Sequence, residues 1–223
     1  MHIAAKACLE EISEIWIPIM FRKLKWMMLL TMCSALCSIP ARSLDQAAGQ
    51  ILGGSLSSPI RLEVFSDFQC PACRDLYLGT IRQVLQDYAS KDKVCVIYHE
   101  YPLSIHQYAR EAARYSEAAS RLGQQKLLPV YDSLFTDQAQ WSQDGSLEAT
   151  VSKALSLEDF QKLKKIMQDS SINAAIEKEV QLGLQKEVKS TPTLFIYYIG
   201  KQQKVEGVVT YLVLKQFIDS IVK

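Results

Sequence analysis

Residues 62–73 read LEVFSDFQCPAC, and the architecture can be worked out from this stretch. Its first half is apolar enough for a buried strand, and its end carries Cys70 and Cys73 with Pro71 between them. Proline is tolerated at a helix start because its φ is fixed and an N–H there needs no intrahelical partner. The stretch therefore predicts a strand that passes into a helix, with two thiols in the first helical turn.

This placement of the thiols predicts a redox centre. Two cysteines separated by two residues can close a small disulfide ring, and the free N–H groups and positive dipole end of the helix stabilise the first thiolate. Such cysteines have pKa values lowered from roughly 8.5 to about 3.5–7.5, and the thiolate is the attacking species in disulfide exchange. We therefore expect Cys70 and Cys73 to exchange disulfides.

The main alternative is a zinc site. Cys95 and His99 follow the two thiols along the chain and would complete a tetrahedral ligand set. However, residues 94–98 are apolar and rich in β-branched side chains, which favours a buried strand. Residues four apart on a strand are about 13 Å from each other, too far for one metal ion. We therefore favour the redox pair, and expect Cys95 to be a buried packing residue.

Residues 20–42 have the layout of a secretory signal, because three basic residues precede an apolar run over 26–37. This run is shorter than the roughly 20 residues of a membrane span. We expect cleavage near residue 42 and a periplasmic or otherwise extracytoplasmic location; the alternative is an uncleaved membrane anchor. Since a signal begins with its basic region, we expect Met20 to be the true start, with a genuine N-terminal extension as the alternative.

Composition favours a single folded domain with no nucleic-acid partner. The chain has 25 basic and 24 acidic residues, which gives none of the positive excess typical of nucleic-acid-binding proteins. Hydrophobic residues make up 48% of the chain, enough for one core of good size. Residues 43–57 contain several glycines and serines without an apolar period, so we expect a linker there and a domain over 58–223.

The order of predicted elements is β-α-β, then helices, then β-β-α. The first part comprises a strand over 60–65, a helix over 70–90 and a strand over 94–99. Four or five helices follow over about 105–187. The last part comprises a strand over 193–199, a hairpin turn at 200–203, a return strand over 204–206 and a closing amphipathic helix with apolar positions at 214, 217, 218 and 221. Pro192 stands at the start of a strand, one of the few places where a sheet admits proline.

Four segments in this order resemble the DsbA-like thioredoxin-fold thiol–disulfide oxidoreductases. They are residues 65–73, residues 101–109 with the motif Tyr-Pro-Leu and a histidine before a helix, the Thr-Pro-Thr of 191–193, and the Val-Glu-Gly of 205–207. The resemblance spans about residue 58 to the C-terminus. It implies an α/β thioredoxin fold in which a helical insertion at about 105–187 separates the β-α-β half from the β-β-α half.

The resemblance also implies roles for individual residues. Cys70 would be the exposed nucleophile and Cys73 the buried resolving thiol, with a redox-active disulfide between them and no bound metal or other cofactor. Pro192 would be cis, leaving the Thr191 backbone free to pair with an extended substrate segment by strand addition. The dipeptide Pro71-Ala72 and the residue Thr191 would tune the reduction potential.

The sequence departs from the family at one position. Related sequences often place an acid six residues before the first active cysteine, where it relays a proton to or from the buried thiol, and this chain has Val64 there. Glu63 is adjacent, but strand alternation turns it to the opposite sheet face. We expect steps that remove the Cys73 proton to be slowed.

The other polar residues near the motif receive no catalytic role from the sequence. We interpret His99 and His106 as structural or surface residues, and Asp67 as part of the turn between strand and helix.

The leading interpretation is an exported oxidoreductase that donates the Cys70–Cys73 disulfide to unfolded or folding proteins that contain cysteines. The resemblance implies a membrane reoxidant of the DsbB or vitamin K epoxide reductase type. One alternative is an isomerase or reductase of the same fold. A further alternative is a chaperone-like module that binds clients without essential redox activity.

Overall fold

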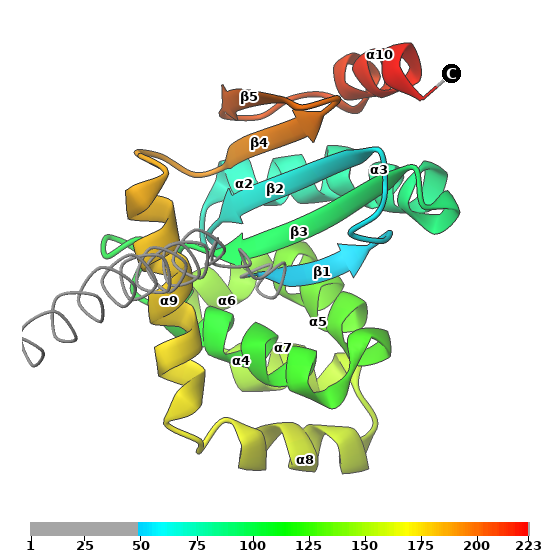
Figure 1. Ribbon diagram of the computed structural model, residues 1–223. Coiled ribbons are helices and arrows are strands. Elements are labelled where there is room, and N and C mark those ends of the chain that lie inside the picture. Colours follow the sequence, from blue (N-terminus) through cyan, green and yellow to red (C-terminus); the bar gives the residue numbers. More distant parts are fainter. Residues whose placement is uncertain (1–48, 223) are drawn as a thin grey trace, which may run out of the picture. The chain divides into compact units, whose positions relative to one another are not determined.

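A computed structural model describes residues 49–222 of the chain (Figure 1). Within these residues the strands form one five-stranded sheet in the order β1-β3-β2-β4-β5. The strands are β1 (Gln50–Gly53), β2 (Ile60–Ser66), β3 (Val94–Glu100), β4 (Thr193–Tyr198) and β5 (Lys201–Glu206). β2 and β3 are parallel, and the other neighbouring pairs are antiparallel.

A long helical segment connects β2 to β3, as a parallel pair requires. It comprises α2 (Pro71–Leu76), a π-helical turn η1 (Tyr77–Ile81) and α3 (Arg82–Asp87), followed by the short 3₁₀ helix η2 (Ala89–Lys91). The closing helix α10 (Tyr211–Ile221) lies beside this segment, with Leu214 and Ile218 buried in the same apolar cluster as Ile81 and Val84.

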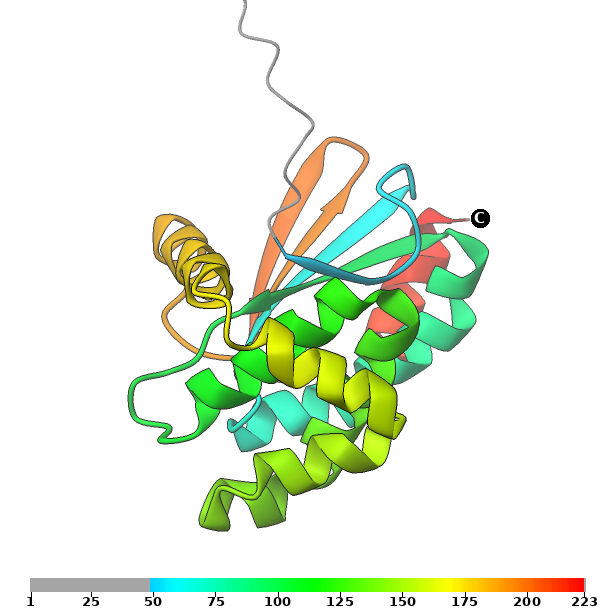
Figure 2. The same ribbon diagram turned by 90° about the horizontal axis from the view of Figure 1, so that it is seen from below.

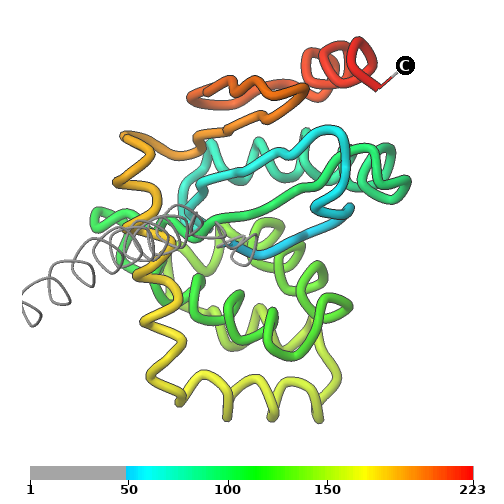
Figure 3. Tube along the Cα trace, viewed as in Figure 1, coloured from blue at the N-terminus to red at the C-terminus, as the bar shows by residue number. Residues whose placement is uncertain are grey.

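Six helices lie between β3 and β4. They are α4 (Ala109–Leu122), α5 (Gln124–Thr136), α6 (Gln138–Asp144), α7 (Leu147–Ala154), α8 (Leu157–Ile166) and α9 (Ser171–Gln185). Small buried residues on α4, including Ala112 and Ser116, allow its neighbours to approach closely. The chain then runs from α9 directly into β4 (Figure 3), which brings the segment before β4 beside the central strands.

Both faces of the central sheet are covered. Leu62, Val64 and Val96 belong to the main apolar cluster, on the face packed by α2, η1 and α10. Phe65 and Phe195 lie in a second, smaller cluster with residues near the end of α9. Figure 2 shows α9 and α10 on opposite sides of the sheet. This coverage explains why all seven residues of β3 are buried.

The structure corrects three sequence-based expectations. Six helices, and not the four or five expected, lie between β3 and β4. The linker expected over residues 43–57 is wrong for Gln50–Gly53, which form β1 and pair antiparallel with β3. Four residues are too few to show a strand period without their partner. The turn expected at 200–203 occupies only Ile199 and Gly200, both with positive φ, and β5 begins at Lys201. Residues 201–204 are polar because this edge strand is exposed.

The predicted secretory signal, its cleavage point and the start at Met20 lie outside the described residues. Along residues 49–222, every helix is too short or too polar to cross a lipid bilayer.

Candidate active site

The two thiols stand at the junction of β2 and α2. Cys70 is the N-cap residue of α2, with φ −76° and ψ 123°, and Pro71 occupies the first helical turn. The extended N-cap geometry and the proline explain why the helix begins here. Cys73 lies one turn along, on the buried face of α2.

Both cysteines are free thiols in this structure, and their surroundings differ. Cys70 keeps 8% of its surface accessible and Cys73 keeps 1%. The Cys70 thiol donates to the carbonyl oxygen of Thr191 over 3.5 Å, whereas the Cys73 sulfur accepts from the backbone N–H of Asp67 over 3.4 Å. Cys70 is thus the more accessible thiol, but it is less exposed than the resemblance implies, because the segment before β4 covers it.

The two thiols have opposite acid–base properties. The pKa of Cys70 is lowered to about 6, first by the hydrogen bond from the Cys73 thiol, and also by the backbone N–H groups of Cys73 and Ala72 and by Thr191, against the opposing effect of burial. Burial, followed by the neighbouring Cys70 sulfur, raises the pKa of Cys73 well above its ordinary value. Near neutral pH, Cys70 is therefore the thiolate and Cys73 retains its proton.

The segment before β4 forms the other wall of the site. The Thr191–Pro192 peptide bond is cis, which is the geometry that the resemblance implies. The Pro192 carbonyl accepts from the N–H of Gly207 over 2.8 Å, so the segment is held to the loop before α10. The Thr191 hydroxyl is buried without a hydrogen-bond partner among the described residues, and it is close enough to Cys70 to stabilise the thiolate.

Asp67 organises the site to a degree that the sequence does not show. Its carboxylate is fully buried. It accepts from the backbone N–H groups of Gln69 over 2.7 Å and Leu103 over 2.8 Å, and it lies 2.8 Å from Nδ1 of His106. Asp67 thus joins the motif to the loop that follows β3, and His106 belongs to this arrangement. An aspartate directly after the buried strand β2 is the signal that could have revealed it.

Two glutamine side chains fasten the motif to the helical insertion. Gln69 accepts from the N–H of Tyr108 over 2.7 Å and donates to the carbonyl of Ser142 over 3.2 Å. In the other direction, Gln138 of α6 donates to the carbonyls of Phe68 and Cys70 over 2.6 and 2.9 Å. Gln138 does not stand out in the sequence, because nothing local relates it to a motif far away in the chain.

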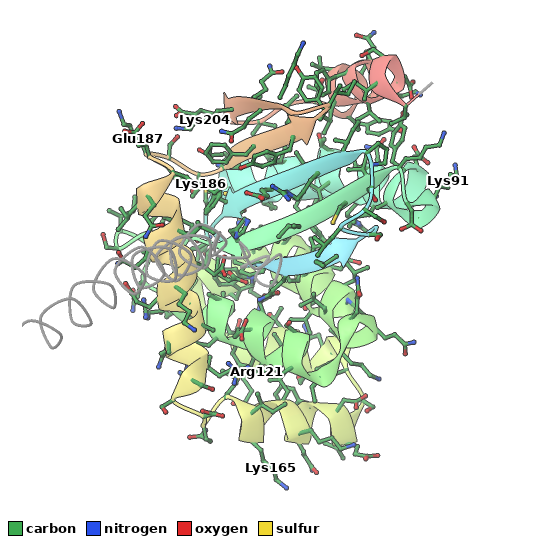
Figure 4. The ribbon with its side chains drawn as sticks, in the orientation of Figure 1. Lys91, Arg121, Lys165, Lys186, Glu187 and Lys204 are labelled. Carbon is green, nitrogen blue, oxygen red and sulfur yellow. The ribbon has the colours of Figure 1, made fainter. Side chains whose placement is uncertain are left out.

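Val64 stands at the position where related sequences often have a relay acid, and its surroundings are apolar. Val64 lies beside Tyr98 in the register of β2 and β3, in the same apolar cluster as Cys73. Glu63 faces the other side, as predicted, where its carboxylate lies 2.9 Å from the amine of Lys186. Figure 4 shows Lys186 near the end of α9, beside β4.

The four residues of the zinc alternative are not gathered. Cys95 and His99 lie on β3, and His99 stacks on Phe65 in front of α9, whereas Cys70 and Cys73 pack in the cluster on the other face. Within residues 49–222, no group of three or more His, Cys, Asp or Glu side chains is placed to hold a metal ion. Cys95 is fully buried.

Comparisons with known proteins agree with this geometry. The sequence profile of the family described as Thioredoxin matches residues 46–220. The "Probable disulfide bond formation protein D" of Bacillus cereus is 22% identical over 147 residues, which cover 64% of this chain and 68% of that protein.

Solved structures show the same fold. The thiol-disulfide exchange protein alpha-DsbA2 from Wolbachia pipientis has a TM-score of 0.65 and 21% identity, covering 78% of this chain and 88% of that one. BdbD from Bacillus subtilis, in its oxidised form, has a TM-score of 0.64 and 18% identity, covering 78% of this chain and 93% of that one. The prediction of a thioredoxin fold with a helical insertion is therefore confirmed. The chain belongs to the thioredoxin family, with the fold of the DsbA-like thiol–disulfide oxidoreductases.

Proposed function

We propose that this protein is an exported oxidase of protein thiols, which donates the Cys70–Cys73 disulfide to folding polypeptides. The observation that carries the proposal is the contrast between the two thiols: the pKa of Cys70 is lowered to about 6 and that of Cys73 is raised. A stabilised thiolate favours the reduced form of the enzyme, and a disulfide whose reduced form is stable is a strong oxidant.

The reaction follows from these properties. A substrate thiolate attacks the Cys70 sulfur of the oxidised enzyme, the Cys70–Cys73 bond breaks, and the Cys73 sulfur leaves and takes up a proton. A second substrate thiolate then attacks the substrate sulfur of the mixed disulfide, and Cys70 leaves as the stabilised thiolate. The substrate loses two electrons and gains a disulfide, and the enzyme becomes a dithiol.

The backbone at Thr191 and its cis bond to Pro192 lie next to the Cys70 sulfur and are suited to hold a substrate strand there. We further propose that a membrane protein of the DsbB or vitamin K epoxide reductase type reoxidises the enzyme. Export is supported by the signal-like pattern of residues 20–42 and by the name of the Bacillus cereus relative, a probable disulfide bond formation protein.

The direction of electron flow is tested by the reduction potential. The purified protein would be equilibrated with a series of glutathione ratios, and the disulfide fraction measured by mass spectrometry after alkylation. We expect a potential near about −120 mV, as for a strong oxidant. A potential near about −270 mV, that of thioredoxin, would favour a reductase and contradict the proposal.

Catalysis is tested on a reduced, unfolded substrate that regains activity only when its disulfides form. A variant with Cys70→Ser and Cys73→Ser should lose this activity, whereas Cys95→Ala, which removes the buried cysteine of β3, should retain it. Full activity in the double variant would favour the chaperone-like alternative. N-terminal sequencing of the protein from its host should find a start near residue 43. A protein that still begins at residue 20 would favour the alternative of an uncleaved membrane anchor.

A further inference from the structure

One side chain of the helical insertion, that of Gln138, binds two backbone carbonyls of the redox motif, those of Phe68 and Cys70. The Gln138 side chain at the start of α6 is buried, with 3% of the residue accessible. Its amide nitrogen donates to the Phe68 carbonyl over 2.6 Å and to the Cys70 carbonyl over 2.9 Å. Both N–H groups of the amide thus have an acceptor in the redox motif.

These two carbonyls control how Cys70 enters the helix. Cys70 has an extended backbone, and its carbonyl also accepts the N–H of Arg74 over 3.1 Å, the first hydrogen bond of α2. The Phe68 carbonyl belongs to the peptide plane before Gln69 and the Cys70 carbonyl to the plane after Cys70, so fixing both restrains the backbone between them and with it the direction of the Cys70 Cα–Cβ bond. That direction decides whether the sulfur faces the free N–H groups of the first helical turn.

Gln138 is well placed to hold this orientation because its own helix is fixed. Trp141, one turn further along α6, is fully buried, and its ring N–H donates to the Leu134 carbonyl over 2.6 Å. From the opposite direction, Gln69 binds Tyr108 and Ser142. The reactive segment is therefore held between two amide side chains on a rigid support.

We propose that Gln138 is a positioning residue of the redox centre: by binding the Phe68 and Cys70 carbonyls, it holds Cys70 where the N–H groups of α2 stabilise the thiolate. The inference rests on the proposed function, since it assigns part of the oxidising power to the helical insertion. Without the amide, the motif keeps its cysteines but loses part of the stabilisation of its reduced form.

The test replaces Gln138 by Met, which has a similar length and no hydrogen-bond donor. Gln143→Met is the matched control, because Gln143 is an exposed residue on the same helix. Two quantities are measured in each protein: the midpoint of the ultraviolet absorbance of the Cys70 thiolate against pH, and the equilibrium with glutathione. For Gln138→Met we expect a higher pH midpoint for the thiolate. We also expect the protein to become a weaker oxidant of glutathione, with an equilibrium constant about tenfold lower, which corresponds to about 30 mV. The control should match the wild type.

A merely structural role would lower the melting temperature and leave both redox quantities unchanged, and this result would overturn the inference. If Gln138→Met does not fold, Gln138→Asn is used, which keeps an amide that is too short to reach both carbonyls. Loss of the folded circular dichroism spectrum in both variants would likewise reject a positioning role. A thioredoxin-like potential in the wild type would contradict the proposed function, while the difference between variant and wild type would still decide the inference.

Discussion

At the scale of single residues, two identical side chains in one helical turn acquire different chemistry from their positions. Cys70 is at the start of α2, where the Cys73 thiol, backbone N–H groups and Thr191 favour the thiolate, and Cys73 is on the buried face, where burial disfavours the charged form. The chain thus places a thiol with a lowered pKa beside one with a raised pKa, without an acid at position 64. We expect removal of the Cys73 proton to be slow, because Val64 in the same cluster has no ionisable group and burial raises the pKa of Tyr98 well above its ordinary value.

The Thr191 hydroxyl provides a prediction at this scale. Thr191→Val keeps the shape and removes one of the groups that lower the pKa of Cys70, a smaller contributor than the Cys73 thiol. Since the thiolate is then less stable, the Cys70 pKa should rise above about 6 and the protein should become a weaker oxidant. The measurement is the pH titration of thiolate absorbance, with Thr210→Val, in the loop before α10, as control. An unchanged midpoint would show that the hydroxyl does not act on Cys70.

At the scale of elements, β1 and α4 meet at a buried carboxyl. Glu100, the last residue of β3, accepts from the hydroxyl of Ser116 on α4 over 2.6 Å, and Ser116 also lies 2.9 Å from the Gln50 side chain of β1. Burial raises the pKa of Glu100 well above its ordinary value, with further contributions from Glu117 and Glu179. The interaction between these elements therefore involves a carboxyl that is favoured in its protonated form.

This arrangement predicts a stability that depends on pH. Because the Glu100 pKa is higher in the folded than in the unfolded state, its contribution is fully present below the unfolded value of about 4.3 and is lost as pH rises through the folded value. Glu100→Gln keeps the polar contacts and stays neutral. Its free energy of unfolding in urea, relative to wild type, should therefore increase from about pH 4 to about pH 8.

Glu111→Gln, which changes an exposed carboxylate on α4, serves as the control and should give a difference that varies little with pH. A constant difference between Glu100→Gln and the wild type across the pH range would show that folding does not raise the pKa of Glu100.

At the scale of the whole molecule, the site is a junction of three segments that are far apart in the chain. The motif follows β2, the cis bond precedes β4, and Gln138 belongs to the insertion between β3 and β4. A client chain would lie along Thr191 with its cysteine at Cys70, and it would be released when a second thiol resolves the mixed disulfide.

This geometry predicts that clients can be trapped. In Cys73→Ser, no internal thiol competes for the Cys70 mixed disulfide, so complexes with clients should accumulate several-fold and disappear on reduction. Cys70→Ser is the matched control and should trap none. Non-reducing gel electrophoresis with mass spectrometry of the linked peptides provides the measurement. Equal trapping by both variants would contradict the assignment of Cys70 as the nucleophile.

The sequence alone was enough for the order of the elements and for the place of the two thiols at a helix start, because these signals are local, whereas the thioredoxin fold came from the family resemblance. An apolar strand followed by Cys-Pro-Ala-Cys defines a helix start with thiols in its first turn, and the β-α-β, helical and β-β-α parts each have their own periodicity. The Thr-Pro segment was also visible, although the resemblance, and not its local sequence, indicated the cis bond.

The remaining features required distant parts of the chain to meet. β1 is too short to have a period of its own, and it is a strand because β3 supplies its hydrogen bonds. Asp67, Gln69 and Gln138 look like ordinary polar residues in the sequence, since their partners lie tens of residues away or in another element. Buried polar groups must find hydrogen-bond partners, and only the packing of the insertion against the motif determines which ones they find.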